Sequence, residues 1–334
     1  MEPADRIRAA VALEPTDRPP AAWWGHTYRE EWSAPDLARV TARRQREFGW
    51  DVVKLQPRAC CFAQAFGSEY RPAMEFRDAP ALVRPAVLRV EDWDRVTAAE
   101  APVPSLIEQN DALRAVIGEL GPGVPVIQTV FSPLTVAGYL AGEDRARTAA
   151  ELRERPDLVG PALARIAHDL ASFAASAVDA GAAGIFFAVS GFASVDLMSV
   201  DDYRRLVLPY DRRVLDAVAG AWLNVLHLCG PRLSFELADD LPSHVVSWSS
   251  HQPGNPALAD GRSLAGRAVM GGLDHEGALV RGTPAEVRAE RDAAIEAAGG
   301  VGLVVAPGCS VPPEAPEENL REVTGAGTGT SSPA

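Results

Sequence analysis

Short apolar runs alternate along the chain with longer stretches in which Ala, Leu, Arg and Glu recur at helical spacing. The runs GIFFAV at 184–189 and VGLVVA at 301–306 contain no polar side chains, as is typical of strands covered on both faces. The pattern predicts strands at 51–55, 124–130, 184–189, 223–228, 245–248, 267–271 and 301–306. It predicts helices at 36–48, 106–119, 156–180, 200–219, 231–239 and 284–298. Repeated alternation of strand and helix indicates parallel strands joined by right-handed crossovers.

The 334 residues are enough for one large α/β barrel, although two smaller domains would have the same total length. No linker divides the chain, so we expect a single (β/α)8 TIM barrel with an N-terminal helical extension over residues 1–324. Residues 325–334 read GAGTGTSSPA and offer too little apolar surface to pack, so we expect a disordered tail there.

Charge and composition argue against several classes of partner. The net charge is −13, from 45 acidic and 32 basic residues, and no cluster of Lys and Arg offsets it, so nucleic acid is not expected as a partner. No run of about 18 apolar residues suggests a membrane span, and the charged N-terminus does not resemble a signal peptide. Four cysteines in a chain of this length do not form a disulfide scaffold. We therefore expect a cytoplasmic protein whose cysteines are metal ligands or core residues.

Two predicted strands end in side chains that suit a metal ion. His227 and Cys229 lie two residues apart at the end of one strand, so both side chains point to the same face. Cys309 follows the last predicted strand and is expected at the same rim, where barrel enzymes place their chemistry. Imidazole and thiolate suit zinc, and three protein ligands leave the fourth position open, as in catalytic zinc sites. The alternative is that these side chains are ordinary packing residues, because Cys is among the most buried residue types.

Several segments, in the same order, resemble the uroporphyrinogen decarboxylase superfamily, which includes the zinc-dependent methylcobamide:thiol methyltransferases. They are FSPLTVAGYL at 131–140, DAGAAGI at 179–185, YRRLVLPY at 203–210, HLCG at 227–230, GGLD at 271–274, GTPAEV at 282–287, GCSVPP at 308–313 and PEEN at 316–319. Together they cover most of the chain. The resemblance implies a TIM barrel and one of two chemistries.

The decarboxylase chemistry fits this sequence poorly. In the family, decarboxylases carry an N-terminal R-Q-A-G-R-Y segment whose arginines meet the carboxylates of the substrate. Here Gly25 stands in place of the first arginine and only Arg29 remains. The F-S-D motif of the decarboxylases is missing around residues 54–65. A macrocycle with many carboxylates needs several cations to hold it, so this branch is disfavoured.

The methyltransferase chemistry fits better, because His227, Cys229 and Cys309 match the zinc ligands of that branch position by position. In that branch Zn2+ binds the thiol of a small acceptor and lowers its pKa, so that a thiolate attacks a methyl group. The methyl donor is typically a corrinoid carried by a partner protein. The resemblance thus implies a zinc-dependent methyltransferase with a thiol substrate and a corrinoid donor.

Two other functions stay open at the level of sequence. One is a decarboxylase or lyase that acts on a small carboxylate substrate. The other is a non-catalytic protein that binds a metal ion or a corrinoid. Barrels of this kind often pair through their helices, so a homodimer is one expected assembly, although a single sequence assigns no surface to it.

Further candidate catalytic residues follow predicted strands. Asp274 comes after the strand at 267–271, and His251 comes after the strand at 245–248, so both are expected near the rim. Asp274 is the stronger candidate, whereas its neighbours His275 and Glu276 are weaker. Solvation in a loop is the alternative for all of them.

A substrate pocket is expected closer to the N-terminus, where aromatic side chains and cations gather. The candidates for its wall are Trp24, His26, Tyr28 and Lys54, with Trp23 and Arg58 as weaker members. Simple packing and solvated charge are the alternatives. Cys60 and Cys61 are adjacent and cannot both bind one zinc ion in an extended segment, so we expect them in the core or the pocket wall. Tyr139, Tyr203 and Tyr210 are expected in the core.

Overall fold

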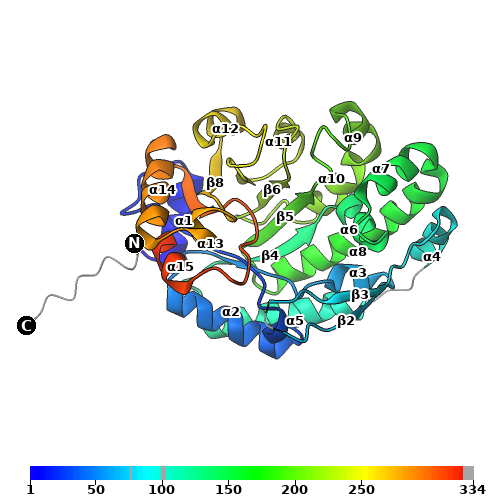
Figure 1. Cartoon of the computed structure of the whole chain (residues 1–334), viewed down its shortest axis with the longest axis horizontal. Coiled ribbons are helices and arrows are strands. Elements are labelled where there is room, and N and C mark those ends of the chain that lie inside the picture. The colour runs from blue at the N-terminus through cyan, green and yellow to red at the C-terminus, as the bar shows by residue number, and fades with distance from the viewer. Residues whose placement is uncertain (76, 99–102, 326–334) are drawn as a thin grey trace, which may run out of the picture.

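Seven parallel strands form one curved sheet in the computed structural model, which describes residues 1–75, 77–98 and 103–325 (Figure 1). The strand order is β1-β4-β5-β6-β7-β8-β9. The strands are β1 Val53–Leu55, β4 Val126–Phe131, β5 Gly184–Ser190, β6 Val225–Cys229, β7 Val245–Trp248, β8 Ala268–Leu273 and β9 Leu303–Pro307. Each pairing is parallel, and each predicted strand is present.

A short N-terminal segment lies between the two edges of this sheet. Ala21 forms a parallel bridge with Val305 of β9. The N–H of Ala22 donates to the carbonyl of Val305 at 2.9 Å, and the N–H of Asp51 donates to the carbonyl of Ala21 at 2.8 Å. This segment therefore occupies the place of an eighth strand between β9 and β1, and the predicted TIM-barrel fold is confirmed.

Helices follow most of the strands and cover the outside of the sheet (Figure 1). Those of the N-terminal half are α1 Pro3–Val11, α2 Ala34–Phe48, α3 Cys61–Ala65, α4 Trp93–Ala98, α5 Pro104–Leu120, α6 Pro133–Leu140, α7 Arg145–Glu154 and α8 Pro156–Asp179. Those of the C-terminal half are α9 Val200–Leu206, α10 Leu208–Asp216, α11 Leu237–Asp240, α12 Leu258–Ala265, α13 Ala278–Arg281, α14 Pro284–Ala297 and α15 Glu317–Thr324. Short 3-10 turns occur at Tyr28–Glu30 and Val90–Asp92, and β2 Glu69–Arg71 pairs with β3 Ala81–Arg84 in an antiparallel hairpin.

Two of the predicted helices were wrong in extent. The helix predicted at 200–219 is divided into α9 and α10, because Pro209 in the first turn of α10 has no N–H for a continuous helix. The helix predicted at 231–239 is reduced to α11, and Arg232 in that stretch has a left-handed backbone with φ of 47°. At the C-terminus, Gly325 caps α15, and residues 326–334 of the predicted tail lie outside the described residues.

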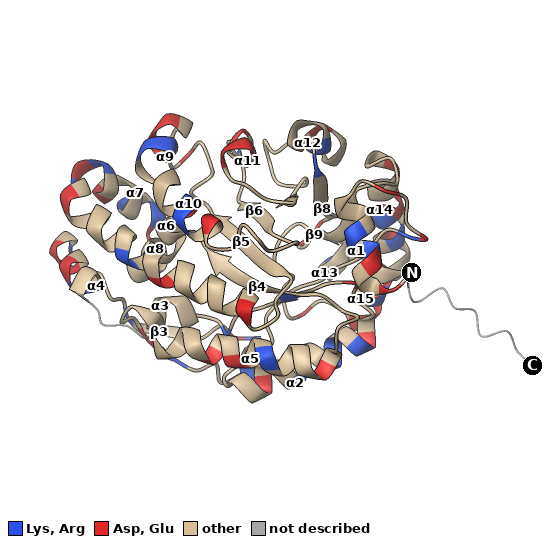
Figure 2. Cartoon of the chain, turned by 180° about the vertical axis from the view of Figure 1, so that it is seen from behind, with Lys and Arg blue, Asp and Glu red and all other residues tan. Residues whose placement is uncertain are grey.

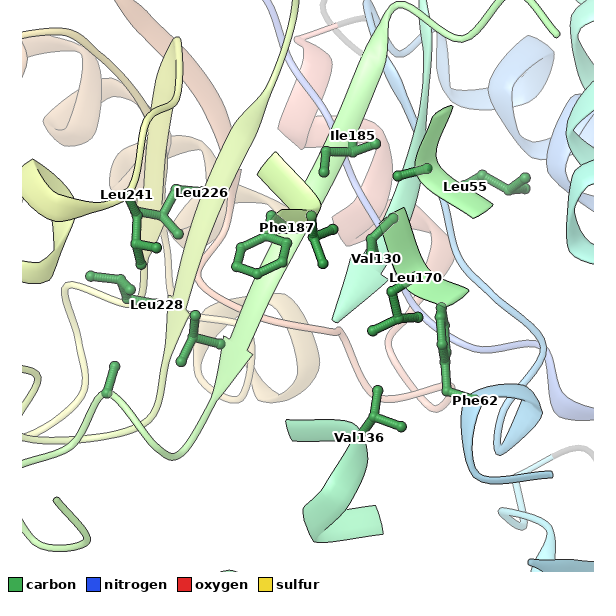
Figure 3. Packing of buried hydrophobic residues seen from close by; sticks show 14 of the residues in the cluster. Leu55, Phe62, Val130, Val136, Leu170, Ile185, Phe187, Leu226, Leu228 and Leu241 are labelled. Carbon is green, nitrogen blue, oxygen red and sulfur yellow. The ribbon is translucent and has the colours of Figure 1, made fainter. Parts of the chain in front are cut away.

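Successive strand residues point to opposite faces of the sheet and form two separate apolar clusters. The outer cluster packs the sheet against the helices, as Figure 3 shows for Val130 and Phe187 beside Leu170 of α8. The inner cluster fills the barrel with Phe186, Ala188, Val225, Met270 and Val304. Trp24 joins this inner cluster from the N-terminal segment, and so does Ile7 of α1.

Charged side chains lie mainly on the outer helices, whereas the strands carry few of them (Figure 2). Among the described residues, none of the helices combines the length and the apolar character that a membrane crossing requires.

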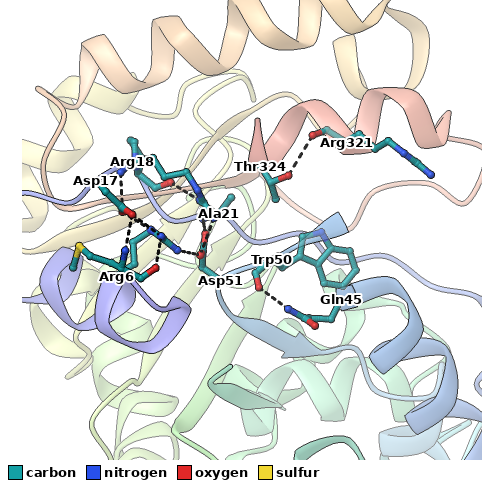
Figure 4. A network of polar contacts seen from close by, with 11 residues as sticks. Arg6, Asp17, Arg18, Ala21, Gln45, Trp50, Asp51, Arg321 and Thr324 are labelled. Atoms are coloured by element: carbon teal, nitrogen blue, oxygen red, sulfur yellow. Dashed lines mark hydrogen bonds and ion pairs between the residues drawn. The ribbon is translucent and has the colours of Figure 1, made fainter. Parts of the chain in front are cut away.

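Asp51 is a buried carboxylate that fixes the N-terminal segment to the sheet (Figure 4). It accepts hydrogen bonds from Arg6 at 2.5 Å, from Arg18 at 2.7 and 3.0 Å, and from the backbone N–H of Ala21 at 2.8 Å. Arg6 is itself buried and also binds Asp17 at 2.7 Å. Three groups, from α1 and from residues 18–21, thus converge on one carboxylate directly before β1.

We predict that Asp51→Asn lowers the free energy of unfolding by about 3–5 kcal/mol, because it removes the buried charge that pairs with both Arg6 and Arg18. Chemical denaturation followed by circular dichroism measures the change. Asp17→Asn is the control: Asp17 is exposed, so its loss should cost much less. Equal losses in the two variants would contradict the role given to Asp51.

Candidate metal centre

His227 and Cys229 lie at the carboxyl end of β6, and Cys309 follows β9 by two residues. His227 is on the same face of β6 as Val225 of the inner cluster, so its ring points into the barrel. The side chain is 3% exposed. The barrel therefore brings together residues that are about 80 positions apart, as the sequence predicts.

The three side chains meet in a geometry that fits a metal ion. Their ligand atoms all lie within 4.8 Å of one another, and the two cysteine Sγ atoms are 3.4 Å apart. Nδ1 of His227 is 3.1 Å from Oγ of Ser247 on the neighbouring strand β7. Nε2 of His227 is buried and has no hydrogen-bond partner within the described chain. One imidazole nitrogen held by a hydroxyl and the other left unpaired is the usual arrangement of a zinc-binding histidine.

The pKa values of the two cysteines are shifted in opposite directions. The hydrogen bond from the Cys229 thiol holds the pKa of Cys309 well below its usual range, and the imidazole of His227 acts in the same direction. The same hydrogen bond, together with burial, raises the pKa of Cys229. Cys309 is therefore the more acidic of the two thiols. A bound cation would favour both thiolates, because metal binding displaces thiol protons.

Lys54 and Trp24 lie next to this cluster, and their role in a substrate pocket stays a prediction. The Trp24 ring centroid is 6.2 Å from that of His227, and Phe186 lies 5.1 Å from it on the other side. The Lys54 ammonium is 5.0 Å from the centre of the Phe186 ring and donates to Gln56. Burial lowers the pKa of Lys54 to about 7, although the two metal-site cysteines act in the opposite direction.

His26 and Tyr28 line a cavity of about 260 Å³ beside the cluster. Their rings stack with centroids 4.9 Å apart. His26 is held on both sides, with Nδ1 at 2.9 Å from Glu31 and Nε2 at 2.8 Å from Gln56. Gln56 also accepts from Lys54, so a chain of polar contacts leads from the cavity wall to the neighbourhood of the cysteines. His227, Cys229 and Cys309 are not part of the cavity wall.

The two predicted catalytic residues lie outside the three-residue cluster. The Asp274 carboxylate accepts from the backbone N–H of Glu276 at 3.1 Å, within the turn after β8. His251 Nε2 is 3.1 Å from the carbonyl of Gly272 and 3.4 Å from Glu290 of α14. Their catalytic roles stay predictions.

His275, which the sequence analysis ranks as a weaker candidate than Asp274, lies close enough to Cys309 to act on it. It is 6% exposed, and its Nδ1 is buried without a hydrogen-bond partner in the described chain. Its charge acts on Cys309 and lowers the pKa of that thiol. The sequence does not reveal which side chain of the Asp274–His275–Glu276 turn is buried.

The remaining candidates have structural partners. Arg58 is buried and pairs with Glu108 at 3.0 Å. Cys61 is buried at the start of α3, and burial raises its pKa, whereas Cys60 lies in the cavity wall. Neither cysteine belongs to the metal cluster, as expected. Tyr203 is buried and donates to Asp211, which agrees with its predicted place in the core.

The whole chain matches one protein family. The family model described as uroporphyrinogen decarboxylase matches residues 2–328. The chain belongs to this family. The family resemblance seen in the sequence motifs is confirmed.

Two kinds of relatives are found among known members of the uroporphyrinogen decarboxylase family. The methylcobamide:CoM methyltransferase MtbA of Methanosarcina mazei is 24% identical over 339 residues, which is 96% of each chain. The methylcobamide:CoM methyltransferase MtaA of Methanosarcina barkeri is 26% identical over 341 residues, also 96% of each chain. The uroporphyrinogen decarboxylase of a Nocardioides species is 31% identical, but over 244 residues, or 69% of this chain and 67% of the relative.

The fold of this family member is also seen in solved structures. A methyltransferase from Methanosarcina mazei superposes with a TM-score of 0.77 at 22% identity and covers 97% of both chains. At this level of identity the likeness establishes the fold.

We predict that Ser247→Ala weakens zinc binding by about 10- to 100-fold, because it removes the hydrogen bond that orients the His227 ring. Competition with a chelating dye measures the affinity. Ser234→Ala is a matched control, since Ser234 is also buried and its hydroxyl has no partner in the described chain. Unchanged affinity in Ser247→Ala, with the fold intact, would contradict a positioning role for this hydroxyl.

Proposed function

We propose that this protein is a zinc-dependent methyltransferase that transfers a methyl group to a small thiol. The observation that carries the proposal is the cluster of His227, Cys229 and Cys309, whose ligand atoms lie within 4.8 Å of one another at the carboxyl ends of two strands. One imidazole and two thiolates form a donor set suited to zinc, and three protein ligands leave one position for a substrate. A zinc ion held there would lower the pKa of the acceptor thiol, so that its thiolate forms at neutral pH.

The protein's own residues would organise this reaction in three ways. Ser247 orients the His227 ring so that Nε2 points at the metal position. Trp24 and Phe186 pack against the His227 ring and exclude water from its sides. Lys54, buried near the two cysteines, compensates the negative charge of thiolates in a region of low polarity.

The reaction balances as a displacement at carbon. The acceptor sulfur forms a new bond to the methyl carbon, the bond between that carbon and the donor breaks, and its electron pair stays with the donor. The thiol proton leaves to solvent. We take a methylated corrinoid on a partner protein as the donor, because the full-length relatives are methylcobamide:CoM methyltransferases.

The alternative is a decarboxylase or lyase, and the relative from Nocardioides supports it. Residue 25 argues against it. A Cβ atom on Gly25 would lie 2.5 Å from the carbonyl oxygen of Val311 and 3.0 Å from the Trp23 ring. The backbone here therefore leaves no room for the arginine that the decarboxylase motif has at this position.

The decisive test is the metal content of the purified protein and its response to thiols. We predict about one zinc ion per chain, and a zinc-edge X-ray absorption signal that gains about one sulfur neighbour when thiol is added. Cys229→Ser and Cys309→Ser should each reduce zinc to near zero and abolish methyl transfer. Cys60→Ser, which removes a cysteine outside the cluster, should keep the zinc ion.

Two outcomes would overturn this function. If both metal-site variants kept full methyl transfer without zinc, the cysteines would be packing residues. If the protein instead released carbon dioxide from a carboxylate substrate after thorough chelation, the decarboxylase alternative would replace the proposal.

A further inference from the structure

Arg145 places a guanidinium in the wall of the cavity. The cavity of about 260 Å³ includes His26, Tyr28, Gln56, Phe131, Tyr139 and Arg145 in its wall. Among the described residues, nothing forms a side-chain hydrogen bond or an ion pair with the Arg145 guanidinium, whereas Arg58 in the same wall pairs with Glu108. A guanidinium in a cavity wall that is not bound to an acid of the chain is available to an anionic ligand.

Two glycines lie beside the Arg145 side chain. A Cβ atom on Gly191 would lie 2.8 Å from Cδ and 3.2 Å from Nε of Arg145. A Cβ atom on Gly138 would lie 3.7 Å from Cγ of Arg145. The first distance is too short for a real Cβ atom and the second is an ordinary contact, so Gly191, directly after β5, is the glycine that makes room for this side chain.

Contacts around the Arg145 side chain connect it to the candidate metal centre. The N–H of Gly191 donates to the carbonyl of Cys229 at 2.8 Å, so the glycine in contact with Arg145 is also bonded to a metal-site residue. Tyr139 of the cavity wall forms a hydrogen bond with Ser190, which is the register partner of Cys229. The guanidinium acts electrostatically on both Tyr139 and Cys229. The inner end of the cavity therefore lies next to the metal ligands.

We propose that Arg145 is a specificity-determining residue that binds an anionic group, a carboxylate or a sulfonate, at the far end of the thiol substrate. This inference rests on the proposed function, because it takes the metal centre as the site of the sulfur. A guanidinium presents two parallel N–H donors to such an oxyanion, and the pairing is stronger away from bulk water. The aromatic rings of Phe131 and Tyr139 in the same wall supply surface for the short carbon chain between the two ends.

A different role for Arg145 is conceivable from the same contacts, namely to stabilise the Cys229 thiolate. The two roles differ in what they affect. A group that stabilises the thiolate acts on zinc binding with every substrate. A group that binds the substrate anion acts on anionic thiols alone and leaves zinc affinity unchanged.

The experiment compares four thiols on the zinc-loaded protein and on Arg145→Gln: 2-mercaptoethanesulfonate, 3-mercaptopropionate, 2-mercaptoethanol and cysteamine. We expect kcat/KM for the two anionic thiols to fall by about 10- to 100-fold, mainly through KM, with little change for the two others. Arg145→Lys should recover part of the loss, since the charge remains but the paired donors do not. Arg114→Gln, which removes an exposed arginine of α5, is the control and should change nothing.

A binding measurement separates this inference from the proposed function. Isothermal titration of the zinc-loaded protein with ethanesulfonate, which has no thiol, should show weak binding that Arg145→Gln abolishes, whether or not methyl transfer occurs. The inference is overturned if Arg145→Gln weakens all four thiols equally, if it lowers zinc affinity, or if ethanesulfonate binds both proteins alike. Absence of methyl transfer to any thiol, with ethanesulfonate binding still dependent on Arg145, would overturn the proposed function alone.

Discussion

The buried carboxylate of Asp51 is the contact on which the rest of the site depends. It binds Arg6, Arg18 and the N–H of Ala21, and so holds a segment that lies between β9 and β1 with a single bridging residue. The chain continues from this segment to Trp24, whose ring packs against the metal-site histidine and whose carbonyl accepts from Val311 at 3.0 Å. The loop that carries Cys309 is thus tied to the same N-terminal anchor. A barrel closed by so few backbone bonds is stabilised by a strong polar contact at the seam, and here the same segment also contacts the loop that carries Cys309.

Much of this arrangement could be predicted from the sequence, because the relevant signals are local. Unbroken apolar runs identified the seven strands, and the two-residue spacing of His227 and Cys229 placed both on one face of a strand end. The closing segment was not predicted, because only Ala21 forms a bridge with the sheet and two prolines, which lack an N–H, precede it. Ser247 and Arg145 were missed for another reason. Their importance comes from the neighbouring strand and from a glycine directly after β5, and no spacing along the chain encodes such contacts.

The barrel common to this family accommodates two chemistries, and Gly25 shows how a backbone position can separate them. The carbonyl of Val311 lies where a side chain at residue 25 would begin, and Val311 is two residues beyond Cys309. The loop that carries Cys309, a candidate metal ligand, therefore occupies the space that an arginine at residue 25 would need. Within this chain, a close approach of the Cys309 loop to the N-terminal segment and a carboxylate-binding arginine at residue 25 exclude each other.

The net charge of −13 would at first sight oppose an anionic substrate. However, fields from exposed charges are screened beyond about 8 Å at physiological ionic strength, and most of the acidic residues lie on the outer helices (Figure 2). At the mouth of the barrel, positive charge predominates near Cys229, because Lys54 and Arg145 both act on this residue. The acidic side chain in the cavity wall, Glu143, is exposed. These two nearby cations therefore act more strongly at the site than distant acids do, since charge interactions strengthen as polarity and distance fall. An acidic surface with a locally cationic cavity admits anions at one place and disfavours them elsewhere.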